Sequence, residues 1–257
     1  MTQSFVAPQV ELVSVSKSYG NGSLVVDGLN LTVAKGEFVT LLGSSGCGKS
    51  TVLKLISGLT PATSGTITVD GMTPQNARGT VSYIFQDSTL LPWRTVRQNV
   101  GLGLELEGIN GDQRKKKAES LLDLVGLRHV AEAYPRELSG GMKMRVSIAR
   151  ALATSPRLLL MDEPFAALDE MTRDRMNEEI MRMREEQKWT AVFVTHSVAE
   201  AVFLSTRIVI LSPMPGRIHT IVAVDLPSPR TGALRASPSF GELVLQVSRT
   251  LREATLG

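Results

Sequence analysis

Cysteine is nearly absent from this sequence. Cys47 is the only one among 257 residues, so no disulfide can form within the chain. A lone thiol fits a reducing compartment, and the fold must be held by burial of apolar side chains. A chain of this length buries roughly 70–75% of the surface that its unfolded form exposes, which suffices for one large domain with a modest appendage.

Long apolar runs are also lacking. Runs such as Leu158–Met161 span four residues, whereas a helix that crosses a bilayer needs about 20. Residues 1–10 lack the basic and apolar blocks of a signal peptide. We therefore expect a soluble protein that stays in the compartment where it is made.

An excess of charge of one sign is missing as well. The 28 lysines and arginines face 25 aspartates and glutamates, and the net charge of +3 is spread along the chain. Nucleic-acid-binding domains concentrate basic residues on one face or in one segment. The composition therefore argues against nucleic acid as a partner.

Short β patterns fill the first third of the chain, and turn residues separate them. The predicted strands are residues 10–15, 29–33, 37–42, 66–69 and 81–85. One helical pattern, at residues 49–57, follows a glycine-rich loop. The middle of the chain, about 96–153, is predicted to be mostly helical.

From Arg157 onward, strand and helix patterns alternate. Strands are predicted at 158–162, 190–195 and 208–211, and helices at 172–187 and 198–205. The strand runs are continuously apolar, which is typical of strands buried on both faces of a parallel sheet, so the fold class is α/β. The tail predicts a strand at 217–224, a loop and a short helix near 242–254.

The glycine-rich loop carries the first functional motif. Residues 43–50 fit the pattern G-x-x-x-x-G-K-[ST] between an apolar strand and a helix. Glycines let backbone N–H groups point at a phosphate, and the helix N-terminus adds partial positive charge. Lys49 supplies a cation for the β and γ phosphates, the Ser50 hydroxyl suits Mg²⁺, and Thr51 suits an α-phosphate oxygen. The loop itself comprises Gly43, Ser44, Ser45, Gly46, Cys47 and Gly48.

Two acids end the strand at 158–162. Asp162 leaves it beside the predicted phosphate loop, where a carboxylate ordinarily helps to hold Mg²⁺. Glu163 then lies where an attacking water would be, which suits a general base or a water-orienting residue. A strand end that merely turns polar at the solvent is the alternative, and the phosphate loop disfavours it.

A second candidate anion site precedes the helix predicted over residues 142–153. Ser139 is a good N-cap, and Gly140 and Gly141 leave backbone amides uncovered. One chain would then have two phosphate-binding helix ends but acids for a single nucleotide. The mismatch is explained if Ser139 faces a γ-phosphate held by another copy. Taken alone, the motif fits helix capping.

Together these motifs resemble the nucleotide-binding domain of the ABC transporter family over nearly the whole chain. Residues 43–51 match that family's Walker A motif, 138–142 its signature motif and 158–163 its Walker B motif. The other matching positions are Gln86 (Q-loop), Ala167-Leu168-Asp169 (D-loop), His196 (H-loop) and Tyr19, the aromatic residue that stacks on adenine.

The resemblance implies a fold and domain boundaries. The fold is a RecA-like P-loop NTPase core with an N-terminal antiparallel β-subdomain and an inserted helical subdomain at about 88–157. The ATPase domain would span residues 1–215, with residues 216–257 as a C-terminal appendage.

The resemblance also implies ligands and roles. The cofactors would be ATP and Mg²⁺, with the metal held by Ser50, Gln86 and Asp162. Lys49, Gln86, Glu163 and His196 are implied as catalytic residues. Nucleotide contacts are implied for Tyr19, residues 43–51, Ser139, Gly140, Gly141 and Asp169. Two positions depart from the common pattern: Ser197 replaces an aspartate, and Lys143-Met144 precede Arg145 where glutamine or arginine is common. Neither change removes a group that touches nucleotide directly, so activity is expected.

Further segments resemble the ATPases of nitrate, sulfonate and taurine importers, a group that includes bicarbonate systems. They are residues 90–96, 161–169, 199–204, 211–217 and 225–230. This resemblance implies three kinds of partner: a second copy or homologous ATPase subunit, two transmembrane permease subunits and a solute-binding protein. It places the chain peripherally at the cytoplasmic face of the bacterial inner membrane. The solute does not touch this chain, so the sequence does not encode its identity.

Three alternatives remain distinguishable. A soluble ABC ATPase of DNA repair or translation usually carries a long coiled-coil insertion or tandem domains, and this sequence has neither. A nucleotide-binding module without catalysis would have a damaged Lys49, Glu163 or His196, and all three are present. An exporter ATPase is disfavoured only by the segments that resemble importers.

Overall fold

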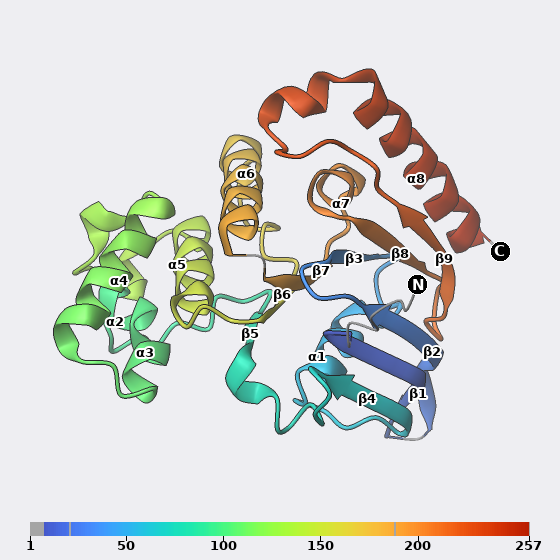
Figure 1. The fold of residues 1–257 in the computed structure, drawn as a ribbon, viewed down its shortest axis with the longest axis horizontal. Coiled ribbons are helices and arrows are strands. Elements are labelled where there is room, and N and C mark those ends of the chain that lie inside the picture. Colours follow the sequence, from blue (N-terminus) through green and yellow to red (C-terminus); the bar gives the residue numbers. More distant parts are fainter. Residues whose placement is uncertain (1–7, 21, 188, 257) are drawn as a thin grey trace, which may run out of the picture.

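The computed structural model describes residues 8–20, 22–187 and 189–256. The fold is built on two β-sheets. A three-stranded antiparallel sheet lies against a six-stranded core sheet, and a group of helices projects to one side of the core (Figure 1). The predicted α/β class, with an antiparallel β-subdomain and inserted helices, is confirmed.

The antiparallel sheet consists of β1 (Val10–Tyr19), β2 (Ser23–Val33) and β4 (Ser64–Val69), in the order β2-β1-β4. Strands β1 and β2 are longer than the predicted 10–15 and 29–33. Their ladder continues past polar residues because register shifts between Leu12 and Ser18 absorb the irregular positions, among them Ser14 with a φ of 50°. The polar residues in these stretches interrupt the apolar pattern, so the sequence predicted only part of each strand.

The core sheet has the order β5-β6-β7-β3-β8-β9. Its strands are β3 (Phe38–Leu42), β5 (Val81–Ile84), β6 (Leu158–Asp162), β7 (Thr190–Val194), β8 (Arg207–Leu211) and β9 (Ile218–Ala223). Neighbours pair in parallel except β9, which runs antiparallel to β8. The continuously apolar runs therefore form a mostly parallel sheet, as predicted.

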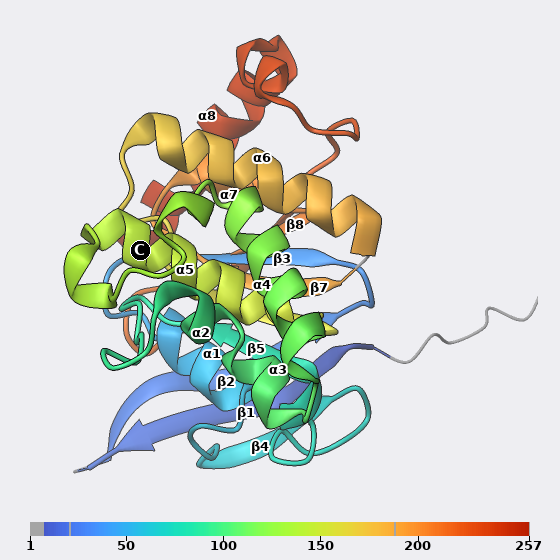
Figure 2. The ribbon, with the colours of Figure 1, turned by 90° about the vertical axis from the view of Figure 1, so that its left-hand side faces the viewer.

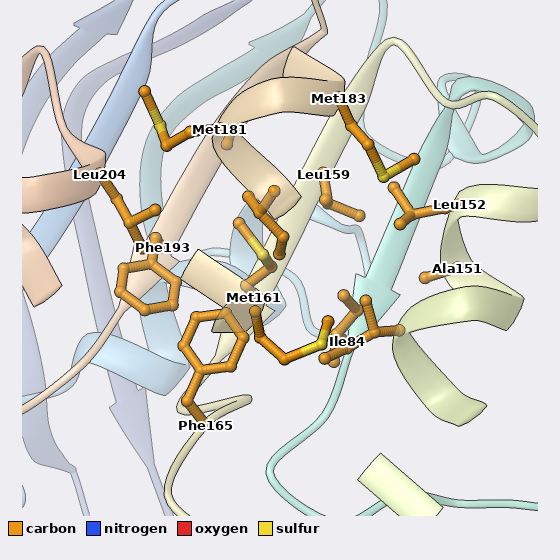
Figure 3. Packing of buried hydrophobic residues seen from close by; sticks show 14 of the residues in the cluster. Ile84, Ala151, Leu152, Leu159, Met161, Phe165, Met181, Met183, Phe193 and Leu204 are labelled. Atoms are coloured by element: carbon orange, nitrogen blue, oxygen red, sulfur yellow. The ribbon is translucent and has the colours of Figure 1, made fainter. Parts of the chain in front are cut away.

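Alternate residues of the central strands face two separate hydrophobic clusters. In β6, Leu158 and Leu160 pack with the antiparallel sheet and with α1 (Lys49–Ile56). Leu159 and Met161 face the other side, where α6 (Glu170–Gln187) and α7 (Val198–Leu204) cover the sheet. Figure 3 shows this second layer, in which methionines from α6 lie beside side chains of the sheet. The predicted core stripe of α6 (Met176, Ile180 and Met183) is confirmed as buried.

The projecting helices are α2 (Val96–Val100), α3 (Leu102–Leu106), α4 (Gly111–Leu124) and α5 (Gly140–Ala153), grouped at the β5 side of the core sheet (Figures 1 and 2). Short 3-10 turns occur at Arg78–Thr80, Arg128–Val130 and Pro135–Glu137. Thr95, Asn110 and Ser139 cap α2, α4 and α5 by accepting backbone N–H bonds. Most of α5 is buried in the same cluster as the core helices, which joins this group to the sheet.

The C-terminal segment adds β9, a 3-10 turn at Gly232–Ala236 and α8 (Pro238–Leu256). Helix α8 exceeds the predicted 242–254 at both ends and packs on α7 and β8 (Figure 1). The buried guanidinium of Arg230 donates to the carbonyls of Phe203 (2.8 Å) and Ser205 (2.7 Å), so it caps the C-terminus of α7. Among the described residues, no helix combines the length and apolar character that a membrane span requires.

Candidate nucleotide-binding site

Three predicted motifs follow neighbouring strands of the core sheet. Strands β6, β7 and β3 are consecutive in the sheet and parallel, so the residues that follow them lie at one edge. Asp162 ends β6 and Glu163 follows it, His196 comes shortly after β7, and Gly43 opens the loop after β3. This edge therefore gathers a phosphate-binding loop, two acids and an imidazole.

The loop between β3 and α1 surrounds the ammonium group of Lys49. Its Nζ donates to the carbonyl oxygens of Gly43 (2.9 Å) and Ser44 (2.8 Å), and the residue is only 6% exposed. Gly48 has a φ of 96°, and a Cβ there would lie 3.0 Å from the carbonyl oxygen of Val25. The loop thus needs glycine at this turn. Ser45 and Gly46 lie exposed at its rim, and Ser50 and Thr51 are half-buried in the first turn of α1.

Asp162 accepts hydrogen bonds on both carboxylate oxygens. Ser50 Oγ donates to Oδ1 (2.8 Å) and the Tyr83 hydroxyl donates to Oδ2 (3.2 Å). Burial raises the pKa of the Asp162 carboxyl, and the nearby Glu163 adds to this, while the two hydrogen bonds lower it. Burial also raises the pKa of the Tyr83 phenol, which keeps it protonated as a donor. The pair holds Asp162 in one orientation.

Two of the three predicted metal ligands are brought together. Ser50 and Asp162 present hard oxygen atoms 2.8 Å apart, and Mg²⁺ is typically bound by one or two such oxygens together with phosphates and water. The residues therefore fit Mg²⁺. Gln86, the third predicted ligand, lies exposed in the loop after β5, and within the described residues it has no hydrogen bond to either partner.

Glu163 and His196 form a pair at the sheet edge. The Nδ1 of His196 lies 3.2 Å from Oε2 of Glu163. The Glu163 backbone N–H donates to the carbonyl of Val194 (3.0 Å), and its φ of 46° lies in the left-handed region. The side chain of His196 is 66% exposed and that of Glu163 is 23% exposed. A carboxylate and an imidazole therefore lie together, accessible to solvent, at the edge of the sheet that also carries the predicted phosphate loop.

The predicted signature residues lie at the start of α5. Ser139 Oγ accepts the backbone N–H of Met142 (3.3 Å), so Ser139 is an N-cap, and both Ser139 and Gly140 are exposed. A Cβ on Gly141 would lie 3.2 Å from the side chain of Leu168. The start of α5 therefore touches the D-loop of the same chain. No hydrogen bond joins these residues to the phosphate loop in the part of the chain that the structure describes.

Two further predicted nucleotide contacts stand at the surface. Asp169 caps α6 by accepting the backbone N–H of Thr172 (2.9 Å), and hydrogen bonding from Thr172 lowers the pKa of its exposed carboxyl. Tyr19 ends β1 with its residue 43% exposed, and the ammonium of Lys17 lies 4.8 Å from the centre of its ring. Both side chains are accessible to an added ligand or a second chain.

Two residues at the site lie outside the predicted set. Tyr83 reads as an ordinary strand residue, yet its hydroxyl reaches Asp162. Gly216 lies in a proline-rich turn, yet its N–H donates to the Val25 carbonyl (2.8 Å), and a Cβ on it would lie 2.0 Å from the carbonyl oxygen of Cys47. Neither has a local sequence signal, because each contact joins segments that are distant in the chain.

Comparison with known proteins identifies the same family that the sequence motifs resemble. The profile of the family described as ABC transporter matches residues 26–166. The chain is 45% identical over 238 residues to the nitrate import ATP-binding protein NrtD of Synechocystis sp., covering 90% of each chain. It is 43% identical over 249 residues to the taurine import ATP-binding protein TauB of Rhizobium johnstonii, covering 92% of this chain and 94% of that protein.

A solved structure shares the fold. The dimeric post-hydrolysis structure of the ATP-binding cassette MJ0796, bound to ADP and Pi, aligns with a TM-score of 0.79 at 32% identity, over 85% of this chain and all of that one. The chain therefore belongs to the ABC transporter family. It is a transporter ATPase, which couples ATP hydrolysis to transport, and the predicted resemblance to nitrate and taurine importer ATPases is confirmed.

Proposed function

We propose that this chain powers the uptake of a small anionic solute of the nitrate, sulfonate, taurine or bicarbonate kind. The supporting observation is near full-length similarity to two importer ATPases, NrtD and TauB, at 45% and 43% identity. The partners would be a second ATPase subunit, two transmembrane permease subunits and a solute-binding protein. The chain would lie peripherally at the cytoplasmic face of the bacterial inner membrane.

We assign chemical roles from the geometry of the sheet edge. Lys49 would neutralise the β and γ phosphates, and Thr51 would bind the α-phosphate. Glu163 would accept a proton from the attacking water as the water oxygen bonds to the γ-phosphorus and the bond from that phosphorus to the β–γ bridging oxygen breaks, which releases ADP. His196, 3.2 Å from Glu163, would contact the γ-phosphate and hold the carboxylate toward that water. The rest of the phosphate loop would supply backbone N–H groups.

Ser50 and Asp162 would hold Mg²⁺, which would offset the negative charge that develops on the phosphates during transfer. Gln86 would reach the same ion from its exposed loop. Tyr19 would stack on adenine. Within the chain, we assign residues 1–215 to the ATPase domain, with a helical subdomain at about 88–157, and residues 216–257 to an appendage that contributes β9 and α8.

The exposed start of α5 suits a phosphate held by a second copy. Ser139, Gly140 and Gly141 would grip the γ-phosphate across a head-to-tail dimer, and Asp169 would lie at the same interface. Closure would bring together the two surfaces that contact the permeases. Trp93 is a candidate for that contact, since it is 71% exposed and so is not a core residue of its own helices.

Transport in cells tests this proposal directly. A strain lacking the chain should lose uptake of at least one labelled solute among nitrate, taurine, an alkyl sulfonate and bicarbonate. Wild-type chain should restore that uptake. The Glu163→Gln variant should not, because losing a general base lowers turnover by about a hundredfold or more while ATP still binds. Unchanged uptake of all four solutes, or a defect in export instead, would refute the importer assignment.

A further inference from the structure

One arginine contacts both the D-loop, which follows Glu163, and helix α7, which follows His196. Arg173 lies in the first turn of α6, and its Nη2 donates to the carbonyl oxygen of Leu168 (2.9 Å) in the D-loop. Its Nε lies 3.5 Å from Oε1 of Glu200 in α7, an ion-pair contact. The D-loop follows Glu163, and α7 follows His196. The guanidinium therefore links the segments that leave β6 and β7.

The link continues into the turn around His196. Thr195 donates its hydroxyl to Oε2 of Glu200 (2.5 Å) and accepts the backbone N–H of Ser197 on the same oxygen (3.0 Å). The Glu200 N–H in turn donates to the Ser197 hydroxyl (3.3 Å). His196 therefore lies in the chain between Thr195 and Ser197, and both of these neighbours form hydrogen bonds with Glu200.

Glu200 is an unusual residue to find inside this structure, because it is only 5% exposed. A buried carboxylate is strongly disfavoured unless cations and hydrogen bonds compensate it. Burial raises the pKa of the Glu200 carboxyl, whereas the Thr195 hydrogen bond and three facing groups lower it: Arg173 from α6, His196, and Arg235 from the 3-10 turn before α8. Arg235 also forms an ion pair with Asp174 (2.9 Å).

We propose that Arg173 and Glu200 are positioning residues for ATP hydrolysis, which hold the D-loop and the His196 turn in a fixed relation to each other. The inference rests on the proposed roles of Glu163 and His196. Among the described residues, neither Arg173 nor Glu200 has a hydrogen bond to the phosphate loop or to Glu163; both would act through the backbone and the Thr195 hydroxyl.

The physical reason lies in the geometry of the pair. Glu163 and His196 lie on different loops. The 3.2 Å distance between His196 Nδ1 and Glu163 Oε2 therefore depends on the positions of the two loops relative to each other. Parallel strands fix the loop origins but not their course beyond the sheet. A displacement of about 1 Å in a reacting group can lower a rate by about a hundredfold. A bridge between the loops keeps such displacements small.

The primary test is Arg173→Met in the full-length chain, compared with Arg182→Met. Arg182 lies on the same helix, and its ion pairs with Glu179 and Glu186 stay at the surface within α6. We expect Arg173→Met to lower kcat for MgATP by about ten- to a hundredfold, with KM for ATP within about threefold of wild type. Arg182→Met should leave both values within twofold, since exposed pairs contribute little.

Two more variants test the bridge itself. Glu200→Gln retains the shape and the bond from Thr195 but loses the charge that faces Arg173, so kcat should fall several-fold. In the double variant with Arg173→Met, the losses should not multiply, because the two residues act through one contact. Arg173→Lys can reach one partner but not both, since lysine has a single nitrogen, so it should restore part of the rate.

The inference is overturned if folded Arg173→Met keeps kcat within twofold of wild type, or if its loss appears only as a higher KM. If Arg173→Met fails to fold, Glu200→Gln decides the matter by the same kcat limit. Glu163→Gln, measured alongside, separates the two levels of argument. If Glu163→Gln is active, the proposed function of the site is refuted. If Glu163→Gln is inactive and Arg173→Met is fully active, only the positioning role of Arg173 and Glu200 is refuted.

Discussion

Replacing Tyr83 with phenylalanine removes one hydroxyl from the edge of the core sheet and little else. The ring stacks on Phe85 with centroids 4.2 Å apart, and phenylalanine can keep that contact. What is lost is the donor to Oδ2 of Asp162, while Ser50 still donates to Oδ1. The variant therefore isolates the effect of one hydrogen bond on the carboxylate proposed to hold Mg²⁺.

The size of the effect follows from the bond's length and charge. A hydrogen bond to a charged group contributes about 1.5–3 kcal/mol. At 3.2 Å, the Tyr83 bond is longer than the usual O–H···O contact, so the lower figure applies. About 1.5 kcal/mol corresponds to roughly a tenfold weaker activation by Mg²⁺, at the lower end of the range for groups that orient metal ligands.

The pH dependence has a definite sign. The phenol stabilises the charged form of Asp162 and so lowers the pKa of that carboxyl. Removing the phenol raises this pKa, so the acid limb of the activity profile should move to higher pH. The deficit of Tyr83→Phe relative to wild type should accordingly grow as the pH falls.

The assay is steady-state ATP hydrolysis against Mg²⁺ concentration at several pH values. Tyr134→Phe serves as the control, since Tyr134 is a surface residue of the helical group. The reasoning is refuted if Tyr83→Phe has the Mg²⁺ dependence of wild type at every pH. A shift of the acid limb to lower pH would refute the assigned role of the hydrogen bond even if activity fell.

Three other predictions rest on separate features. Gly216→Ala should weaken ATP binding at least tenfold in isothermal titration, because its Cβ would lie 2.0 Å from a carbonyl oxygen of the phosphate loop. Gly79→Ala is the control, since its Cβ would meet nothing within 4 Å and ATP should bind normally. Equal affinities of the two variants for ATP would refute the predicted clash. Trp93→Ala should reduce copurification with permease subunits and leave Tm nearly unchanged, since the side chain is exposed; a large fall in Tm with intact copurification would contradict a docking role. Lys49→Ala and Ser139→Arg should each be inactive alone and regain single-turnover hydrolysis when mixed, because one site of the mixed dimer carries neither lesion; no recovery would count against shared sites.

Much of the site could be predicted from sequence because its residues follow strands. A buried parallel strand has a recognisable apolar pattern, and the polar residues that end it must emerge at a common edge. The structure brings Lys49, Asp162 and Glu163 to one edge of the sheet, as the phosphate-loop and strand-end patterns predict, whereas His196 at the same edge was predicted only from the family resemblance. The G-x-x-x-x-G-K-[ST] motif predicts Ser50, whose hydroxyl donates to Asp162 at 2.8 Å.

The residues that were missed make contacts across the fold. Tyr83 and Arg173 have no motif of their own, and residues 199–204, which include Glu200, indicate only the resemblance to importer ATPases. Each of the three side chains contacts a partner far along the chain. Gly216 reads as a turn residue, although close approach to the phosphate loop is what requires glycine there. Such roles depend on packing between elements, which local patterns do not encode.

Backbone strain at Glu163 is the last feature with a measurable consequence. Its φ of 46° places a residue with a Cβ in the left-handed region, which costs about 1–2 kcal/mol. The N–H bond to the Val194 carbonyl (3.0 Å) holds it there, and such strain is typical of functional sites. Glycine relieves the strain but costs about 0.4–1 kcal/mol through the unfolded chain. Glu163→Gly should therefore be more stable than Glu163→Ala by up to about 1.5 kcal/mol in urea titrations, with both variants inactive.

The sign of that difference is the informative quantity, because an ordinary helical position gives the opposite order. Lys116 lies exposed in the interior of α4, where glycine should be less stable than alanine by about 0.8–1 kcal/mol. Measuring both pairs under one condition cancels errors of extrapolation. If alanine is the more stable substitute at both positions, Glu163 is not strained. If the order reverses at Glu163 alone, the chain gives up stability to hold its proposed general base beside His196.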